Sequence, residues 1–303
     1  MIKSALIFGY GSIGSRHASI LKKNFKLNKI YIFTKKKIQG FTVIKKLQNI
    51  KKLKIDYFVI ASPTSKHFKN LEFIEKNFKN KKILVEKPLF HRDIKKNFKK
   101  NKIYVGYNLR FNNLIRYVKD FIKGKKIIDI KITCNSYLPD WRPKKNYTKT
   151  SSASKLLGGG VILELSHELD YIRWLFGNFK IKFIDFGKCS NLKINTEDYL
   201  KLFGKIKNTN LSVDLNYYSR INKRNIYIDG LDFSLLADLI SGELTINNKG
   251  KIFSKKFSQE KNDSYIKQHR TILINNGTQV CSFIFAKQTM SFIENIKKWK
   301  KRN

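Results

Sequence analysis

Acidic residues are scarce in this chain. Its 303 residues include 22 Asp and Glu against 63 Lys and Arg, a formal charge of +41, and no acid occurs before Asp56. Cysteine is also rare, with three residues far apart in the sequence, Cys134, Cys189 and Cys281. That number and spacing exclude a disulfide framework and a CxxC metal site, so we expect free thiols and no bound metal.

Long apolar runs are missing as well. No stretch approaches the ~20 apolar residues that a membrane-spanning helix requires, and the chain opens on a short apolar strand instead of a signal peptide. We therefore expect a cytoplasmic protein with no membrane partner. Hydrophobic residues still make up 42% of the sequence, which is enough for sizeable cores, and the length suits two domains.

The positive charge is spread along the chain and consists mostly of lysine, with 53 Lys against 10 Arg. Proteins that read nucleic acids favour arginine, because its guanidinium group makes bidentate hydrogen bonds to phosphates and bases. The charge is therefore typical of a general composition bias. We expect salt-sensitive binding of polyanions but no specific nucleic-acid partner.

Short apolar runs alternate with helical patterns up to Val105. Such runs are typical of strands covered on both faces, as in a parallel sheet, and their alternation with helices predicts a doubly wound α/β domain. We predict a helix at Ser12–Asn24, a lysine-rich helix before the last strand, and strands at 4–8, 29–34, 41–44, 57–61, 83–85 and 103–105.

After Gly124 the strands become longer and hairpin-sized turns separate several of them. One long helix is predicted at Val161–Phe176, and an amphipathic helix is predicted at Ser282–Lys300. The predicted strands are 127–137, 180–188, 199–206, 211–218, 225–229 and 244–246.

These patterns predict two domains with a boundary after residue 120. The first, residues 1–120, has the doubly wound parallel sheet. The second, residues 121–303, is an α+β domain with an open, mostly antiparallel sheet, and its terminal helix can pack back on the first domain.

A GxGxxG sequence, Gly9 to Gly14, follows the first predicted strand and opens the first predicted helix. In that context Gly9 permits a tight turn, Gly11 lets a pyrophosphate approach the backbone, and Gly14 lets helix and strand pack closely. Ser12 and Ile13 then lie at the helix N-terminus, which faces the phosphates. The pattern predicts a Rossmann dinucleotide-binding domain, and a glycine turn without a ligand is the alternative.

The segment expected to face the adenosine ribose carries no acid. Rossmann domains that bind NAD place an Asp or Glu about 20 residues after the glycines, but here that region holds Thr34, Lys35 and two further lysines. The missing carboxylate is stronger evidence than the lysines in so lysine-rich a chain. It favours NADP over NAD as the cofactor.

Five motifs, in order along nearly the whole chain, resemble those of the Gfo/Idh/MocA oxidoreductase family. They are the glycine motif, the Ala61-Ser62-Pro63 segment with His67, the Glu86-Lys87-Pro88 segment, the Gly106–Phe111 segment with Asn108 and Arg110, and a Gly158–Gly177 segment that contains Glu164, His167 and Asp170.

The resemblance implies an NAD(P)-dependent oxidoreductase. Members commonly transfer a hydride between nicotinamide C4 and a secondary hydroxyl or ketone of a sugar, cyclitol or related molecule, and their open sheets often build dimers or tetramers. It also implies that Lys87 lies beside the nicotinamide and that His167 acts as acid or base. The cofactor would further contact Ala61, Ser62, Pro63, His67 and Glu86.

Chemistry supports the same two catalytic candidates. Oxidation of an alcohol needs a group of near-neutral pKa to take the hydroxyl proton, and His167 is of that type. Lys87 follows a parallel strand at the edge where open α/β sheets bind ligands. Asp170 lies on the same helix face as His167, where it can bind a substrate hydroxyl, hold the imidazole, or pair with Arg173.

One departure from the family pattern concerns the carboxylate that many members place four residues before the helix histidine. Here that position is Leu163, and Glu164 stands three residues before His167. Whether Glu164 replaces this carboxylate is left open. The departure keeps an alternative function in view, namely a catalytically inactive NADP-binding sensor or scaffold.

The remaining substrate candidates lie before the glycine-rich segment. Trp141 can stack on a sugar ring, and Arg142 or Arg110 can hold a carboxylate or phosphate, while the resemblance adds Asn108. We therefore expect a small, sugar-like and possibly anionic substrate. A purely structural loop around Trp141 is the alternative.

Overall fold

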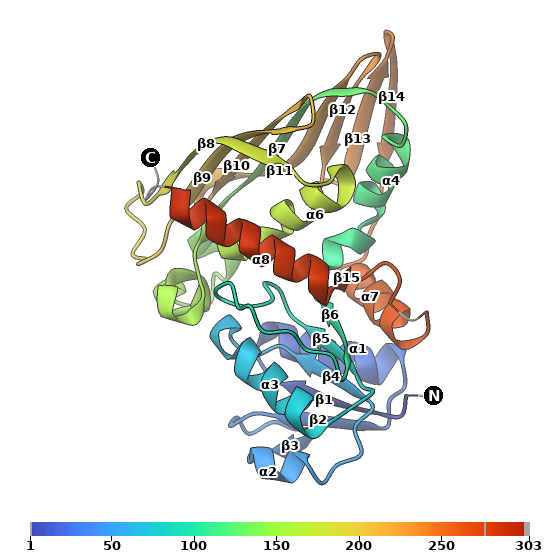
Figure 1. The fold of residues 1–303 in the computed structure, drawn as a ribbon, viewed down its shortest axis with the longest axis vertical. Helices are drawn as coiled ribbons and strands as arrows, with labels where there is room; N and C mark the ends of the chain where they lie inside the picture. The colour runs from blue at the N-terminus through green and yellow to red at the C-terminus, as the bar shows by residue number, and fades with distance from the viewer. Residues whose placement is uncertain (1, 276, 300–303) are drawn as a thin grey trace. The chain divides into compact units, whose positions relative to one another are not determined.

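The computed structural model describes residues 2–275 and 277–299. It divides into two compact units (Figure 1): unit 1 holds the chain up to Asn108 together with Lys261–Phe292, and unit 2 holds Leu109–Glu260 with the residues from Ile293 on. The predicted boundary at residue 120 therefore lies inside α4 (Asn113–Phe121), which belongs to unit 2.

Unit 1 is built on a seven-stranded sheet with the order β15-β6-β5-β4-β1-β2-β3. All its pairs are parallel except the one between β15 and β6. The order reverses between β1 and β4, whose residues are all buried, which explains their uninterrupted apolar sequences. The predicted doubly wound sheet is confirmed. Its strands are β1 (Ser4–Phe8), β2 (Lys29–Phe33), β3 (Thr42–Ile44), β4 (Tyr57–Ile60), β5 (Lys82–Val85), β6 (Lys102–Val105) and β15 (Cys281–Ser282).

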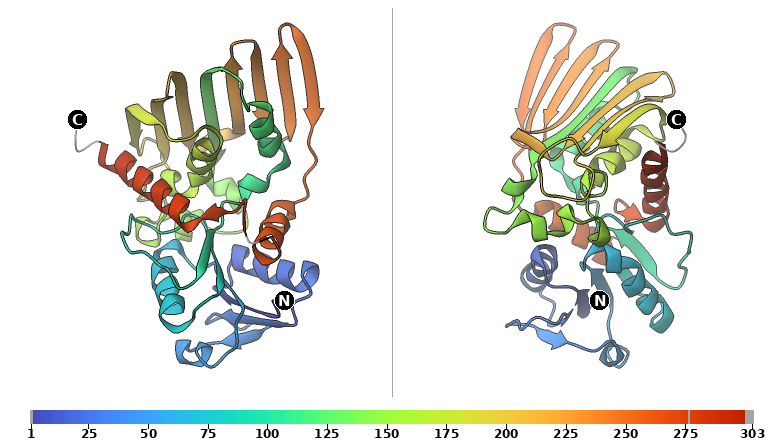
Figure 2. Two further views of the ribbon diagram at one scale, coloured as in Figure 1. Left: turned by 45° about the vertical axis from the view of Figure 1, so that its right-hand side comes forward. Right: turned by 90° about the vertical axis from the view of Figure 1, so that its left-hand side faces the viewer.

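Helices cover both faces of this sheet (Figure 2). On one face, α1 (Ser12–Asn24) buries Ala18 and Leu21 and contacts α7 (Asp263–Leu273), and α3 (His67–Asn77) lies on the other face. The bounds of α1 agree with the prediction, whereas α7 was not predicted. Its last carbonyl groups accept hydrogen bonds from Lys82 Nζ, which helps to hold this distant segment in unit 1.

A short helix and the C-terminal helix are the other two helices described for this part of the chain. The four-residue helix α2 (Leu47–Ile50) precedes β4, and α8 (Phe283–Lys298) follows β15. The C-terminal helix was predicted to run from Ser282 to Lys300, and Lys300 lies outside the described residues.

The prediction of a lysine-rich helix before β6 is wrong, because residues 91–101 contain no helix. Their polar backbone groups find partners in α8 instead: Lys287 Nζ donates to the carbonyl oxygens of Lys95 and Lys96. Phe98 packs against Phe283 at a ring-centroid distance of 5.7 Å. These distant contacts favour an extended segment over a local helix.

Unit 2 is built on an eight-stranded sheet with the order β14-β13-β12-β11-β7-β10-β9-β8. Only β7 and β10 pair in parallel, so the predicted mostly antiparallel sheet is confirmed. β14 was not predicted, because all its residues are exposed and show no alternation, and β12 was not predicted either. The strands are β7 (Ile127–Tyr137), β8 (Lys180–Gly187), β9 (Tyr199–Ile206), β10 (Thr209–Asn216), β11 (Tyr218–Gly230), β12 (Phe233–Asp238), β13 (Glu243–Asn248) and β14 (Lys251–Lys256).

The single helix predicted at Val161–Phe176 is also wrong. The segment forms α5 (Val161–Glu164) and α6 (Ser166–Phe176), and Leu165 breaks the helix between them. The apolar residues on both sides of the break are buried, which is more than one face of a continuous helix presents to a core. The break lets both short helices bury their apolar side chains.

Side chains of this sheet alternate between a buried and an exposed face. In β9, Leu200 and Leu202 are buried, whereas Phe203 is 53% exposed, and α5 contacts both β9 and β10. The three cysteines are free thiols, of which Cys189 is exposed. In the part of the chain that the structure describes, no helix has the length and apolar character to span a membrane.

A buried ion pair ties α6 to the sheet. Glu168 of α6 is fully buried, and its Oε1 accepts hydrogen bonds from Arg224 of β11, at 2.8 Å from Nε and 2.7 Å from Nη2. Removing one partner of a buried pair strands the other charge in the interior. We therefore expect this ion pair to contribute strongly to the folding stability of unit 2.

We predict that Arg224→Ala lowers the free energy of unfolding by about 3–5 kcal/mol, because it leaves the Glu168 carboxylate buried and unpaired. Urea unfolding followed by circular dichroism measures this change. Lys256→Ala is the control, because it removes an exposed pair with Glu243 and should change stability little. Equal effects of the two substitutions would contradict the prediction.

Candidate functional site

Three predicted motifs meet at the carboxyl edge of the sheet in unit 1. Gly9 follows β1, Ala61 follows β4 and Glu86 follows β5, and the parallel register places the ends of these strands side by side. This edge contains the point where the strand order reverses. Open α/β sheets bind their ligands there.

The glycine turn packs as its sequence predicts. Gly9 has φ +96°, and a Cβ atom on it would lie 2.7 Å from the carbonyl oxygen of Ala61. A Cβ atom on Gly14 would collide with the carbonyl oxygen of Gly9. Both positions therefore need glycine for close packing within unit 1.

Gly11 differs from the other two glycines, because a Cβ atom on it would have no neighbour within 4 Å. It precedes α1, whose first turn has no acidic residue and whose N-cap makes no side-chain hydrogen bond. The helix N-terminus, with the backbone N–H groups of Ser12 and Ile13, is therefore suited to an anion. The pyrophosphate of a dinucleotide fits this arrangement.

The segment after β2 is basic and exposed. Lys36 reaches back toward the glycine turn, with Nζ 3.4 Å from the carbonyl oxygen of Tyr10, and its backbone N–H donates to Thr34 Oγ1. Lys35 is exposed. No acid precedes Asp56, so this segment offers hydroxyl and ammonium groups and no carboxylate to a ribose.

His67 joins two of the predicted cofactor-binding loops. It is buried, with Nε2 2.9 Å from the carbonyl oxygen of Ser62 and Nδ1 3.1 Å from that of Pro88. Burial holds the pKa of His67 below its usual value. A carbonyl oxygen only accepts, so a neutral ring donates its single N–H to one of these two loops and packs its other nitrogen against the second. His67 therefore orders the loop that contains Ser62 and Pro63.

Lys87 stands at a partly exposed position in an otherwise buried stretch, Ile83–Phe90. The neighbouring Glu86 is 8% exposed. Its Oε1 lies 2.9 Å from His17 Nε2, and its Oε2 accepts a hydrogen bond from the backbone N–H of Lys87. The buried carboxylate thus lies directly behind the predicted catalytic lysine.

In unit 2, the glycine-rich segment leads into α5 against the half-buried side chain of Glu197. Gly160 has φ +107°, and a Cβ atom on it would collide with Glu197. Burial raises the pKa of Glu197, and its Oε1 accepts a weak hydrogen bond, at 3.4 Å, from the backbone N–H of Ile162. Glu197 therefore fixes the start of α5.

Glu164 and His167 are the partly exposed positions in the buried stretch Val161–Arg173. Glu164 Oε1 accepts a hydrogen bond of 2.8 Å from Ser152 Oγ, whereas Leu163 is 2% exposed. At the position where the family resemblance implies a carboxylate, this chain thus has a core leucine, and the adjacent residue offers a carboxylate.

Asp170 and Arg110 bind each other. The carboxylate accepts two hydrogen bonds from the guanidinium group, 2.8 Å from Nε and 2.7 Å from Nη2, and both side chains are buried. Arg173 donates instead to Asn178 Oδ1. The predicted roles of Asp170 and Arg110 in substrate binding stay predictions, and their observed contact is mutual.

The other predicted substrate residues differ in their surroundings. Asn108 is buried and donates to Ser264 Oγ within unit 1. Trp141 donates from Nε1 to Ser136 Oγ and packs edge-on against Tyr217, while Arg142 is exposed. The loop thus holds the indole in one orientation and leaves the guanidinium in solvent.

Sequence reasoning missed several buried polar residues at these sites. His269 lies more than 200 residues from His17 and Tyr57 in sequence, and no local pattern marks Tyr57 or Ser152 as polar partners. Glu197 stands beside Asp198 at the start of β9, and its only signal is that acids are so rare in this chain.

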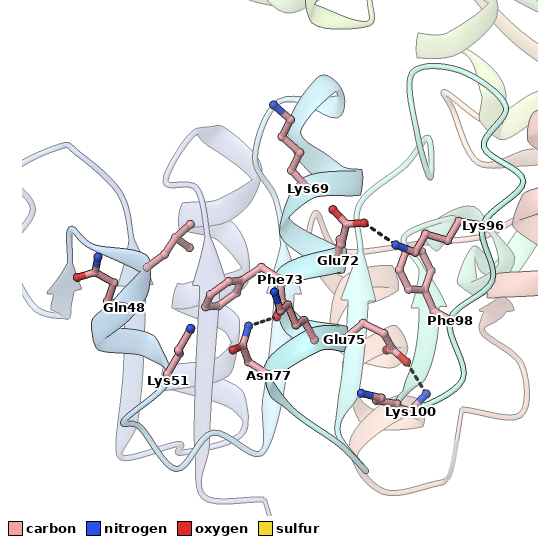
Figure 3. A pocket seen from close by; sticks show the side chains of 12 residues that line it. Gln48, Lys51, Lys69, Glu72, Phe73, Glu75, Asn77, Lys96, Phe98 and Lys100 are labelled. Atoms are coloured by element: carbon pink, nitrogen blue, oxygen red, sulfur yellow. Dashed lines mark hydrogen bonds and ion pairs between the residues drawn. The ribbon is translucent and has the colours of Figure 1, made fainter.

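A groove of about 660 Å³ lies elsewhere on unit 1, between α2, α3 and the segment before β6 (Figure 3). Its lining contains no residue of the glycine turn, the Ala61–Ser62 loop or Glu86–Lys87. Two of its charges are already matched, because Lys96 Nζ binds Glu72 at 2.5 Å. The groove is not the dinucleotide site.

We searched residues 2–275 and 277–299 for side chains that could bind a metal ion. No group of three or more His, Cys, Asp and Glu side chains there could hold a metal ion.

The comparisons with known proteins agree with the motif analysis of unit 1. Residues 3–102 match the Gfo/Idh/MocA family, described as an oxidoreductase family with an NAD-binding Rossmann fold. This match confirms the resemblance drawn from the motifs. No curated protein matches the sequence.

Solved structures share the fold over nearly the full length of both chains. Levoglucosan dehydrogenase in complex with NADH superposes with a TM-score of 0.81 at 15% identity and covers 99% of this chain and 97% of its own. UDP-N-acetylglucosamine 3-dehydrogenase GnnA from Acidithiobacillus ferrooxidans has a TM-score of 0.75 at 13% identity, with 98% and 97% covered. The WlbA dehydrogenase from Bordetella pertussis, in complex with NADH and UDP-GlcNAcA, has a TM-score of 0.76 at 14% identity, with 99% and 97% covered.

We predict that Gly11→Val weakens dinucleotide binding at least about tenfold, or ~1.4 kcal/mol, while unit 1 keeps its stability. The new side chain would fill the space next to the helix N-terminus without meeting protein atoms. Fluorescence titration and thermal unfolding measure the two effects.

Gly14→Ala is the matched control, because its added methyl group collides with the backbone of Gly9 and should lower stability. Full binding by a stable Gly11→Val protein would contradict the placement of the pyrophosphate.

Proposed function

Because residues 3–102 match the Gfo/Idh/MocA oxidoreductase family, we propose that this chain is an NAD(P)-dependent oxidoreductase. It transfers a hydride between nicotinamide C4 and a secondary hydroxyl or ketone of a sugar, cyclitol or sugar acid. The observation that carries the proposal is the convergence of the glycine turn, the Ala61–Ser62 loop and Glu86–Lys87 at one edge of the sheet. Three solved structures of similar fold support the substrate class. One is a UDP-N-acetylglucosamine 3-dehydrogenase, one is a levoglucosan dehydrogenase, and one is a dehydrogenase in complex with UDP-GlcNAcA.

The residues of unit 1 are proposed to bind the cofactor and to act on the substrate oxygen. The nicotinamide, when bound, accepts or supplies the hydride. The backbone N–H groups after Gly11 hold the pyrophosphate, and the ammonium group of Lys87 donates a hydrogen bond to the reacting oxygen. A positive charge at that oxygen stabilises the alkoxide character that develops during the reaction.

The residues of unit 2 are proposed to handle the proton and to bind substrate hydroxyls. His167 takes the hydroxyl proton as the alcohol is oxidised and returns it in the reverse direction. Glu164 supplies the carboxylate that many relatives carry one residue earlier, which its partial exposure supports. Asp170 and Arg110 form a rigid pair on the same helix face as His167.

An anionic substrate is proposed on the basis of Arg142. Its guanidinium group is exposed in a loop that Trp141 anchors, and such a group binds carboxylates and phosphates in a bidentate way. A sugar acid or a nucleotide-linked sugar satisfies this requirement. A homo-oligomer is also proposed, and the exposed Phe183 and Phe203 on one face of the sheet in unit 2 support it.

We predict that Lys87→Ala and His167→Ala each lower kcat by about 10²–10⁴-fold, because the first removes the positive charge at the reacting oxygen and the second removes the proton acceptor. The dissociation constant of the nucleotide should change little, since neither residue is proposed to bind the pyrophosphate. Steady-state kinetics on a panel of sugars and nucleotide sugars measures turnover.

Lys69→Ala removes an exposed lysine elsewhere in unit 1 and is the control. Turnover that survives both test substitutions would refute the proposed roles. A wild-type protein that binds nucleotide but turns over no member of the panel would favour the sensor or scaffold.

We also predict tighter binding of NADPH than of NADH, because Thr34 and the following lysines offer donors to a 2′-phosphate and no carboxylate to a ribose diol. Titrations at ~150 mM salt suppress nonspecific phosphate binding. Lys36→Ala should reduce the preference, whereas Lys69→Ala should leave it unchanged. Equal affinities for the two nucleotides in the wild-type protein would refute the preference.

A further inference from the structure

Four buried side chains from four different segments of unit 1 form a continuous chain of hydrogen bonds. Glu86 Oε1 lies 2.9 Å from His17 Nε2, His17 Nδ1 lies 2.8 Å from His269 Nε2, and His269 Nδ1 lies 3.0 Å from Tyr57 Oη. Both imidazoles and the phenol have no exposed surface, and Glu86 is 8% exposed. We refer to these four residues as the Glu86–Tyr57 chain.

The chemistry of the two ends sets the direction of the hydrogen bonds. A carboxylate can only accept, so His17 Nε2–H donates to Glu86. If His17 is neutral, its Nδ1 accepts from His269 Nε2–H. A neutral His269 then accepts at Nδ1, and Tyr57 donates its hydroxyl proton to it. Every group is satisfied in this arrangement.

The opposite direction leaves a buried hydroxyl proton without an acceptor. It requires a second proton on His17, and His269 would then donate from Nδ1 to the Tyr57 oxygen. Among the described residues, Tyr57 Oη has no hydrogen-bond partner besides His269. Stranding a buried donor is costly, so the arrangement with two neutral imidazoles is favoured.

The electrostatic surroundings agree with this assignment. Burial is the main cause that holds the pKa of His269 well below its usual value. Burial, and then the proximity of Glu86 and Tyr104, hold the pKa of Tyr57 well above its usual value. At neutral pH His269 is therefore uncharged and Tyr57 keeps its proton.

Among the residues that the structure describes, no other titratable side chain makes a hydrogen bond with the four members of the Glu86–Tyr57 chain. Tyr265 of α7 meets the His17 ring edge-on at 5.6 Å and carries the guanidinium group of Arg16 above its own ring. His67 interacts electrostatically with Glu86, as Tyr104 does with Tyr57. The direction of the chain is therefore decided by its own four members.

The carboxylate at the end of the chain is also held sterically. A Cβ atom on Gly106 would lie 2.7 Å from Glu86 Oε1, so the carboxylate packs directly against the segment that follows β6. Its second oxygen accepts from the backbone N–H of Lys87. Glu86 thus has one position, between the ends of β5 and β6.

We propose that His17, His269 and Tyr57 are positioning residues, which form a one-way hydrogen-bond chain that fixes the Glu86 carboxylate behind Lys87. The catalytic consequence rests on the proposed function. Through the Glu86–Tyr57 chain, α7, which lies about 180 residues after Lys87 in sequence, contributes to the charge at the reacting oxygen.

The first test observes the histidine tautomers directly in the wild-type protein. Side-chain ¹⁵N NMR distinguishes Nε2–H, Nδ1–H and doubly protonated rings. We expect His17 and His269 to be neutral Nε2–H tautomers at pH 7, with assignments from His17→Gln and His269→Gln. An Nδ1–H tautomer or a doubly protonated ring at either position would overturn the proposal.

The second test uses His269→Gln, because a glutamine amide can donate or accept. His17 then becomes free to take a second proton, donating Nδ1–H to the amide oxygen. We expect the ¹⁵N signals of His17 to show a doubly protonated ring as the pH is lowered, and kcat to fall with it, because the positive ring offsets the Glu86 charge. The KM for nucleotide should not change.

His91→Gln is the matched control, since it makes the same substitution in unit 1 outside the chain. It should keep the wild-type pH profile of kcat. If His269→Gln does not fold, Tyr57→Phe removes a single oxygen, and the ¹⁵N signal of His269 Nδ1 should then show loss of its hydrogen bond. A pH profile of His269→Gln identical to wild type, or an unchanged Nδ1 signal in Tyr57→Phe, would overturn the proposal.

The two tests separate this proposal from the proposed function. A wild-type protein without turnover on any sugar would refute the function, while the tautomers of His17 and His269 would still decide whether the chain exists.

Discussion

The close approach of Gly9 to Ala61, between the ends of β1 and β4, is the constraint on which the rest of unit 1 depends. It aligns the carboxyl ends of these two neighbouring parallel strands at the edge of the sheet where the strand order reverses. Gly14 then packs against Gly9, so that α1 begins beside this edge with an uncapped N-terminus. A side chain at Gly9 would collide with the loop after β4, and one at Gly14 would push α1 away from Gly9. The geometry that makes room for a pyrophosphate is therefore the same geometry that packs the first βαβ unit.

Elements with strong local signals could be predicted from the sequence alone. The helix at Ser12–Asn24 and the strands at Ile127–Tyr137 and Tyr199–Ile206 have the predicted bounds, because each buries one face or both faces in a regular repeat. Predictions failed where distant contacts compete with local preference. The lysine-rich segment 91–101 is helical by composition, but Lys287 binds its carbonyl groups and keeps it extended.

The candidate site divides in the same way. Lys87, Glu164 and His167 could be named from motifs, and they stand at partly exposed positions within otherwise buried segments. The supporting residues could not be named, because His17 and His269 come from distant segments to hold Glu86, and no motif marks Ser152, which binds Glu164. Arg110 shows the limit of type-based reasoning. Its guanidinium group suits an anionic substrate, but in the structure it binds the carboxylate of Asp170.

The scarcity of acid makes the buried carboxylates informative. This chain carries 22 acids against 63 bases, yet Glu86, Glu168, Asp170 and Asp198 are all buried. Each is bound by specific donors: a histidine for Glu86, an arginine for Glu168 and Asp170, and backbone N–H groups for Asp198. A composition bias toward lysine can change exposed positions, because a single exposed charge contributes little to stability. It cannot remove these acids, because each removal would strand a buried donor or cation. The few carboxylates that remain inside therefore mark the positions where the fold, and the Glu86–Tyr57 chain within it, require a negative charge.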